Sequence, residues 1–83
     1  MRIRHRPRRP PAETMADLLR DQRLASLAPL VGCAMQTLYD WRRGETQPHV
    51  RLLARLAAVL GLPLRRVCDA ARESYRLSHE LLD

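Results

Sequence analysis

Hydrogen-bonding side chains of several kinds lie close together in the middle of the chain. Gln36 carries an amide that can pair with both polar atoms of an adenine edge, and Met35 beside it can contact a thymine methyl group. One helical turn further on, Tyr39 and Asp40 offer a phenol and a carboxylate; the carboxylate could accept from a cytosine amino group or repel phosphate. The guanidinium of Arg43 suits a phosphate. This set predicts recognition of base edges in a nucleic acid, and the alternative for each residue is an ordinary solvated surface.

A short helix over residues 35–43 would present these side chains on one face. Gly32 comes before this helix and Gly44 after it, and glycine readily adopts the left-handed conformation in which helices end. At about 100° per residue, Leu38 and Trp41 fall on the opposite face. We therefore expect these two residues to be structural anchors in the core. A short helix anchored from behind and polar in front is typical of the second helix of a helix-turn-helix motif.

Four further helices are expected around this one, which predicts an all-α fold of five helices. Their approximate ranges are 12–23, 24–31, 49–60 and 63–82. Pro29 is hard to place inside the second of these, because a proline in a helix interior costs about 3 kcal/mol or more. That helix either starts late, near Leu27 or Ala28, or is kinked. The fourth helix has apolar side chains over more than half of its circumference, which predicts the central buried helix.

The positive charge is concentrated at the N-terminus. All 15 basic residues are arginine, and the net charge is +6. Residues 1–11 contain five arginines, three prolines and no acid, whereas ten arginines and nine acids share residues 12–83. Proline blocks helix formation and like charges repel, so we expect a flexible, extended basic arm that follows phosphates or enters a minor groove. The alternative is a solvated tail without specific contacts. The arm residues are Arg2, Arg4, Arg6, Arg8 and Arg9.

Length and composition exclude several classes of protein. A chain of 83 residues, 46% hydrophobic and with three aromatic residues, forms one small domain with a core of Leu, Ala and Val. No apolar run approaches the roughly 20 residues of a membrane span, and the charged N-terminus is no secretory signal, which favours a cytoplasmic, nucleoid-associated location. Cys33 and Cys68 are expected to be free thiols, with one disulfide as the alternative. The histidines have no metal-ligand spacing, so we expect no metal site and no cofactor.

From about Leu19 to Val67 the chain resembles the lambda-repressor/Cro (XRE-type) helix-turn-helix family. The resemblance rests on an ungapped series of residues, namely Leu27, Ala28, Gly32, Thr37, Leu38, Trp41, Gly44, Pro48, Leu53, Leu56, Ala57, Leu60 and Gly61. It implies a five-helix domain in which the helix at 35–43 enters the major groove, with two copies on adjacent half-sites. Residues near the loop, Arg43, His49 and Arg51, are then expected to contact phosphates.

The chain departs from the family pattern at two places. Leu24 stands where the family usually has a glutamine that braces the recognition helix, and Arg23 before it is expected to take the phosphate contact. Arg42 stands where the family often has an acid whose partner is an arginine in the first helix. An ungapped count places Asp17 opposite it, which suggests a reversed Asp17–Arg42 ion pair.

These observations predict a sequence-specific regulator of transcription that binds double-stranded DNA, acts as a repressor and forms a homodimer on a two-fold operator. We expect a basic arm at 1–11, a helix-turn-helix core at 12–62 and a C-terminal helix at 63–83 for dimerisation or partner binding. The alternative is an antitoxin or adaptor that binds a protein through Tyr75 to Leu82, where Leu77, Leu81 and Leu82 lie. An enzyme is not expected, because the sequence offers no catalytic residues, neither a nucleophile–base pair nor a phosphate-binding glycine loop.

Overall fold

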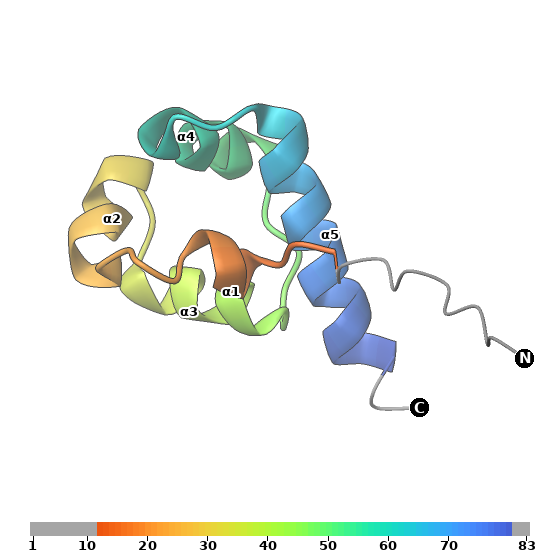
Figure 1. Ribbon diagram of the computed structural model, residues 1–83. Coiled ribbons are helices and arrows are strands. Elements are labelled where there is room, and N and C mark those ends of the chain that lie inside the picture. Colours follow the sequence, from red (N-terminus) through yellow and green to blue (C-terminus); the bar gives the residue numbers. More distant parts are fainter. Residues whose placement is uncertain (1–11, 81–83) are drawn as a thin grey trace, which may run out of the picture.

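Five helices and no strand make up residues 12–80, which are the residues described by the computed structural model (Figure 1). The order of elements is α1 (Met15–Leu18), α2 (Leu24–Val31), α3 (Met35–Arg43), α4 (Val50–Leu60) and α5 (Leu64–Glu80). The long helix α5 runs along one side of the domain, where it packs against α1, α3 and α4 (Figure 1). On the other side, α2 packs against α3 and α4. The all-α, five-helix expectation is confirmed.

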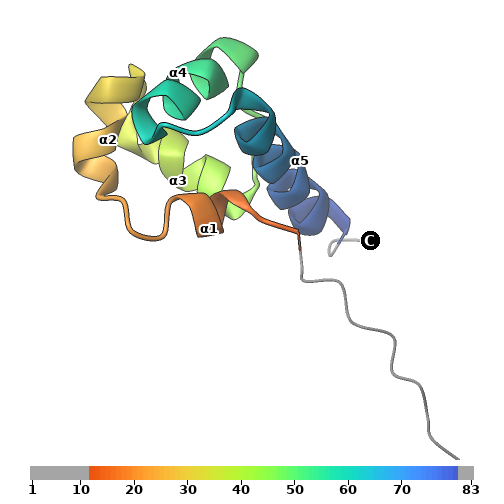
Figure 2. The ribbon, with the colours of Figure 1, turned by 45° about the horizontal axis from the view of Figure 1, so that its top comes forward.

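All five helices contribute to one apolar core. The turned view shows how they surround it, with α2 and α5 at opposite ends (Figure 2). Apolar side chains drive this packing because their removal from water is the main favourable term in folding. The fully buried large side chains are Met15, Leu19, Val31, Leu38, Leu56 and Val67.

The first helix is much shorter than the predicted range 12–23, because α1 ends at Leu18. Its start is fixed by a capping box: Thr14 Oγ1 accepts from the Asp17 amide, and the Asp17 carboxylate accepts from the Thr14 amide. After the buried Leu19, the next four residues are polar and exposed, so a longer helix would bury nothing more. The chain turns there instead, which brings Leu24 into the core.

Pro29 lies inside α2, whose bounds agree with the expected range 24–31, so the alternative of a late start near Leu27 or Ala28 is wrong. The helix begins at Leu24, with Arg23 as its N-cap. Pro29 cannot donate to the carbonyl of Ala25, but both residues are exposed, so water can reach that carbonyl. Burial of Leu24, Leu27, Ala28 and Val31 on the other face offsets the lost hydrogen bond.

The fourth helix is not the central buried one. Only Leu53, Leu56 and Ala57 of α4 are buried, and Val50 and Val59 are 57% and 38% exposed. The distribution of apolar residues therefore predicted more burial of α4 than the structure shows. This helix packs only against α2 and α5, and its remaining surface faces outward. No helix among residues 12–80 has the length and apolar character that a membrane crossing requires.

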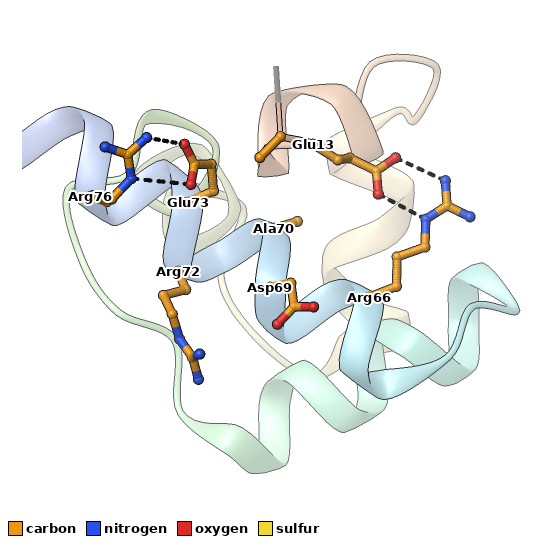
Figure 3. Close-up of a pocket in the computed structure, with 8 residues that line it drawn as sticks. Glu13, Arg66, Asp69, Ala70, Arg72, Glu73 and Arg76 are labelled. Carbon is orange, nitrogen blue, oxygen red and sulfur yellow. Dashed lines mark hydrogen bonds and ion pairs between the residues drawn. The ribbon is translucent and has the colours of Figure 1, made fainter. Parts of the chain in front are cut away.

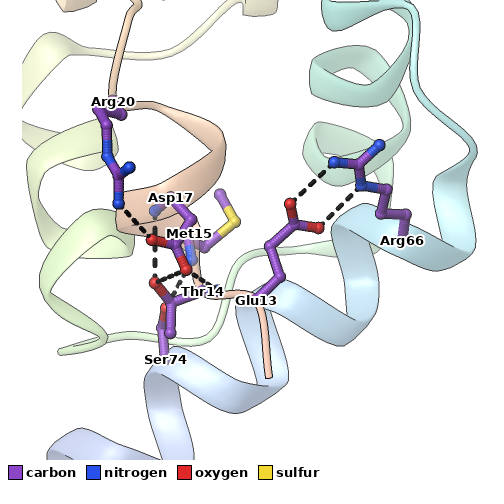
Figure 4. A network of polar contacts seen from close by, with 7 residues as sticks. All are labelled: Glu13, Thr14, Met15, Asp17, Arg20, Arg66 and Ser74. Atoms are coloured by element: carbon purple, nitrogen blue, oxygen red, sulfur yellow. Dashed lines mark hydrogen bonds and ion pairs between the residues drawn. The ribbon is translucent and has the colours of Figure 1, made fainter. Parts of the chain in front are cut away.

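Two polar contacts fix the start of α1 against α5 (Figure 4). The Met15 amide donates to Ser74 Oγ at 2.8 Å, and Ser74 is only 6% exposed. Arg66 holds Glu13 with two hydrogen bonds of 2.8 Å each. The hydrogen bond and the charge of Arg66 lower the pKa of Glu13 below its usual value. These contacts join residues more than 50 positions apart, so they depend on the folded arrangement.

Candidate nucleic-acid interface

The core holds α3 from one side only. Leu38 is 0% exposed and Trp41 is 2% exposed, one turn apart on the same face of the helix. Gly32 ends α2 and Gly44 ends α3, both in the left-handed conformation, so α3 is short and separated from its neighbours by turns. Its bounds, Met35–Arg43, agree with those expected from the sequence.

A network of polar side chains covers the outer face of α3. Asp40 Oδ1 accepts a hydrogen bond from Gln36 Nε2 at 3.0 Å and another from Arg43 Nη2 at 2.8 Å. The same Arg43 nitrogen lies 3.2 Å from Glu45 Oε2. The hydrogen bonds from Gln36 and Arg43 lower the pKa of Asp40, so its carboxylate is an anion at neutral pH. Asp40 therefore joins Gln36 and Arg43, two other residues that are expected to contact DNA.

Two more residues of α3 complete this face. Met35, in the first turn, is 43% exposed. Tyr39 is partly buried against the core, and the guanidinium of Arg42 lies over its ring, 4.8 Å from the centroid. Arg42 thus makes a cation–π contact, and the suggested Asp17–Arg42 ion pair is wrong. Asp17 caps α1 and pairs with Arg20 instead.

The basic and polar residues expected at the DNA backbone lie at helix starts or at the end of α3. Arg23 and His49 are the N-caps of α2 and α4, and Arg51 is in the first turn of α4; all three are exposed. His49 Nδ1 accepts from the Arg51 amide at 3.2 Å. In the neutral ring the proton is therefore on Nε2, which is left as a donor.

The loop after α3 lies directly against α5. A Cβ added at Gly44 would come within 2.6 Å of the Ser74 carbonyl carbon, and closer still to its oxygen. The backbone of α5 therefore leaves room only for glycine here. This contact fixes the C-terminal end of α3, where Arg43 is located.

Away from α3, a charged groove runs between the segment leading into α1 and helix α5 (Figure 3). Glu13 pairs with Arg66 along it, and Glu73 pairs with Arg76. Asp69 and Arg72 also line the groove, which has a volume of about 480 Å³. Its acids and arginines are equal in number, so the groove has no charge excess that would attract a polyanion.

The remaining residues with reactive or metal-binding side chains do not come together in a second site. Cys33 and Cys68 are free thiols, and burial raises the pKa of Cys33. Within residues 12–80, no three His, Cys, Asp or Glu side chains are grouped closely enough to hold a metal ion. The five arm arginines, Leu81 and Leu82 lie outside the described residues.

Three residues that position the helices were not predicted from the sequence. Ser74 accepts a hydrogen bond from the Met15 amide, Arg66 forms an ion pair with Glu13, and Glu45 forms an ion pair with Arg43. Only the last could have been expected, because Glu45 is two positions from Arg43 across a glycine. The other two join α5 to the segment before α1, and no local spacing indicates such contacts.

One comparison with known proteins gives a match. A family model described as helix-turn-helix matches residues 19–67, which run from the end of α1 to the first turn of α5 and make up more than half of the chain. No curated protein and no solved structure matches the chain.

Proposed function

The chain belongs to the lambda-repressor-like (XRE-type) helix-turn-helix family of DNA-binding regulators, and we propose that it is a repressor that reads a specific duplex sequence. The observation that carries the proposal is the division of α3, whose Leu38 and Trp41 are buried while Gln36 and Arg43 on the other face are exposed. A helix held from behind and open in front can enter a major groove without disturbing the core.

In this proposal, α3 supplies the base contacts. Met35 and Gln36 lie at its N-terminal end, which is the part of a recognition helix that reaches base edges. Met35 would contact a thymine methyl group and Gln36 an adenine edge. Tyr39 and Asp40 lie one turn later and face the next base pairs or the groove wall.

The backbone contacts would come from four residues and the arm. Arg23, Arg43, His49 and Arg51 are exposed around α3 and supply donors for phosphate oxygens. The arm would add phosphate or minor-groove contacts. Log affinity falls as log salt rises, and each phosphate neutralised should make this slope more negative by about 0.9.

As a regulator, the protein would act by occupying an operator and excluding polymerase. Two copies on a two-fold site would place their α3 helices one DNA turn apart, about 34–36 Å. This function requires no catalytic group and no cofactor. The protein would act at the nucleoid.

Selection from random duplexes, with the wild-type chain and with Gln36→Ala, tests the central claim. We expect the wild type to select a defined site, and the variant to lose its preference at one base pair while weak binding persists. Arg51→Gln should make the salt dependence less steep by about 0.9 per bound subunit, and so by about 1.8 for the dimer, whereas the matched change Arg72→Gln on α5 should not. Absence of duplex binding by the wild type at low salt would refute the proposal.

Deleting residues 1–11 tests the arm separately. The shortened chain should bind its site more weakly and with a smaller salt slope, because up to five arginines no longer reach phosphates. Unchanged affinity and slope would show that the arm is a tail without DNA contacts.

A second candidate function is that of an antitoxin or adaptor that binds another protein through α5. It rests on Leu77, which is 39% exposed in the last part of this helix. If α5 pairs two copies of the chain, Leu77→Glu should convert a dimer to a monomer in sedimentation and weaken operator binding. If the helix instead binds another protein, as in an antitoxin or adaptor, the isolated chain should be a monomer whose duplex binding the substitution does not change.

A further inference from the structure

Asp40 lies between two of the residues that we propose contact DNA. Its Oδ1 accepts from Gln36 Nε2 at 3.0 Å and from Arg43 Nη2 at 2.8 Å. The three residues are four and three positions apart, so they follow one line along the helix surface. The side chain of Asp40 is 27% exposed and that of Arg43 is 53% exposed. The carboxylate is therefore set deeper than the guanidinium that it holds.

The charge of Asp40 determines which end of the Gln36 amide faces it. An ionised carboxylate only accepts hydrogen bonds, and an amide has one donating end and one accepting end. The Gln36 nitrogen must therefore face Asp40, and the Gln36 oxygen must face away. Asp40 therefore holds the Gln36 amide in one orientation from within α3.

We propose that Asp40 is a positioning residue that sets Gln36 to read adenine and to reject guanine, an inference that rests on the proposed function. With one N–H held by Asp40, the Gln36 amide has one N–H and its Oε1 left for a base. An adenine edge offers one acceptor, N7, and one donor, the N6 amino group, which match this pair. A guanine edge offers two acceptors, N7 and O6, so Oε1 would meet an acceptor with no hydrogen between them.

The role requires that Asp40 remain charged and in place. Arg43 contributes to both, because it donates to the same oxygen and is itself held by Glu45 at 3.2 Å. Glu45 makes no contact with Gln36 in this network. The two acids near Arg43 can therefore be separated by experiment: Asp40 should affect base choice at the position that Gln36 reads, and Glu45 should not.

The test begins by locating the base pair that Gln36 reads. Selection from random duplexes with the wild type and with Gln36→Ala identifies it as the position whose preference disappears, and we expect adenine there in the wild type. Asp40→Asn is then compared at this position. Asparagine keeps the shape but removes the charge and can present either end, so the Gln36 amide can turn. The preference for adenine over guanine should fall on the order of tenfold, with other positions unchanged.

Three controls separate positioning from general effects. Glu45→Gln removes one negative charge at the same end of α3 and should leave the adenine-to-guanine ratio unchanged. Adding Asp40→Asn to Gln36→Ala should cause no further loss at this position, because no amide remains to be positioned. Circular dichroism checks that each variant is folded, and Asp40→Ala replaces Asp40→Asn if the latter unfolds, since alanine favours the helix.

An unchanged adenine-to-guanine ratio in Asp40→Asn overturns the inference while the proposed function stands. Loss of preference at a different base pair also overturns it, because Asp40 would then read that base itself. The same holds if the wild type prefers guanine or a pyrimidine where Gln36 reads, or if Gln36→Ala changes no preference. No duplex binding by the wild type refutes the proposed function, and the inference with it.

Discussion

Replacing Gly44 with alanine should destabilise the protein far more than the same replacement at Gly61. The two glycines have similar backbone conformations, with φ of 75° and 69°. Alanine in this left-handed region costs about 1–2 kcal/mol at either position, because its Cβ crowds the following carbonyl oxygen. At Gly61 this backbone cost should be the only one, since an added Cβ there meets nothing within 4 Å.

At Gly44 a second cost is added. The new Cβ would come within 2.6 Å of the Ser74 carbonyl carbon, which belongs to the backbone of α5 and cannot rotate away. Forcing atoms into a packed site costs about 1–3 kcal/mol. We therefore expect a total loss of about 2–5 kcal/mol, a large part of the stability of a small domain.

Gly32 provides an internal control for this steric argument. Its φ is 85°, and a Cβ there would come within 2.6 Å of Arg55 Nη1. That atom is the far end of a flexible, exposed side chain, which can move aside at little cost. Gly32→Ala should therefore behave like Gly61→Ala and not like Gly44→Ala.

Urea unfolding followed by circular dichroism measures all three variants, and the fluorescence of Trp41 gives a second probe. The midpoint should fall most for Gly44→Ala, with a similar slope in each case because the same surface is exposed. A loss at Gly44 no larger than at Gly61 would show that the loop after α3 does not lie against α5 and that α5 does not fix the end of α3.

Three further predictions concern the core and the contacts of α5. Trp41→Ala should cost about 3–5 kcal/mol and unfold most of the protein at 37 °C, because it empties the space behind α3; a thermal melt that retains the wild-type midpoint contradicts this. Ser74→Ala should cost about 1–3 kcal/mol by leaving the buried Met15 amide without an acceptor, whereas Ser74→Thr, measured in the same urea titration, should keep an acceptor. Because Arg66 lowers the pKa of Glu13 below its usual 4.5, the contribution of this pair is complete above that pH and is lost as the pH falls through the lowered pKa. Stability measured from pH 6 downward should therefore fall less in Arg66→Gln than in the wild type, and identical pH profiles would rule the contribution out.

Local signals in the sequence were enough to locate α3. Glycine at both ends limited its length, and the spacing of Leu38 and Trp41 fixed which face is buried. Both signals act within one or two helical turns, so they do not depend on how the rest of the chain folds. The same reasoning extended the first helix too far, because the helical periodicity gave no reason to stop at Leu18.

The sequence by itself determined the helix-turn-helix core, since caps and apolar spacing are local properties of the chain. Only the tertiary structure decided how that core is held and what surrounds it. The exposure of α4 and the Ser74 and Arg66 contacts with the start of α1 all depend on where α5 lies. Such contacts join residues far apart in the chain. They form only when the helices pack together, so no short segment of the sequence indicates them. The hydrogen bonds that join Gln36, Asp40 and Arg43 are only partly predictable from the sequence. The spacing of the three residues is visible there, but the bonds depend on side-chain conformation in the folded protein.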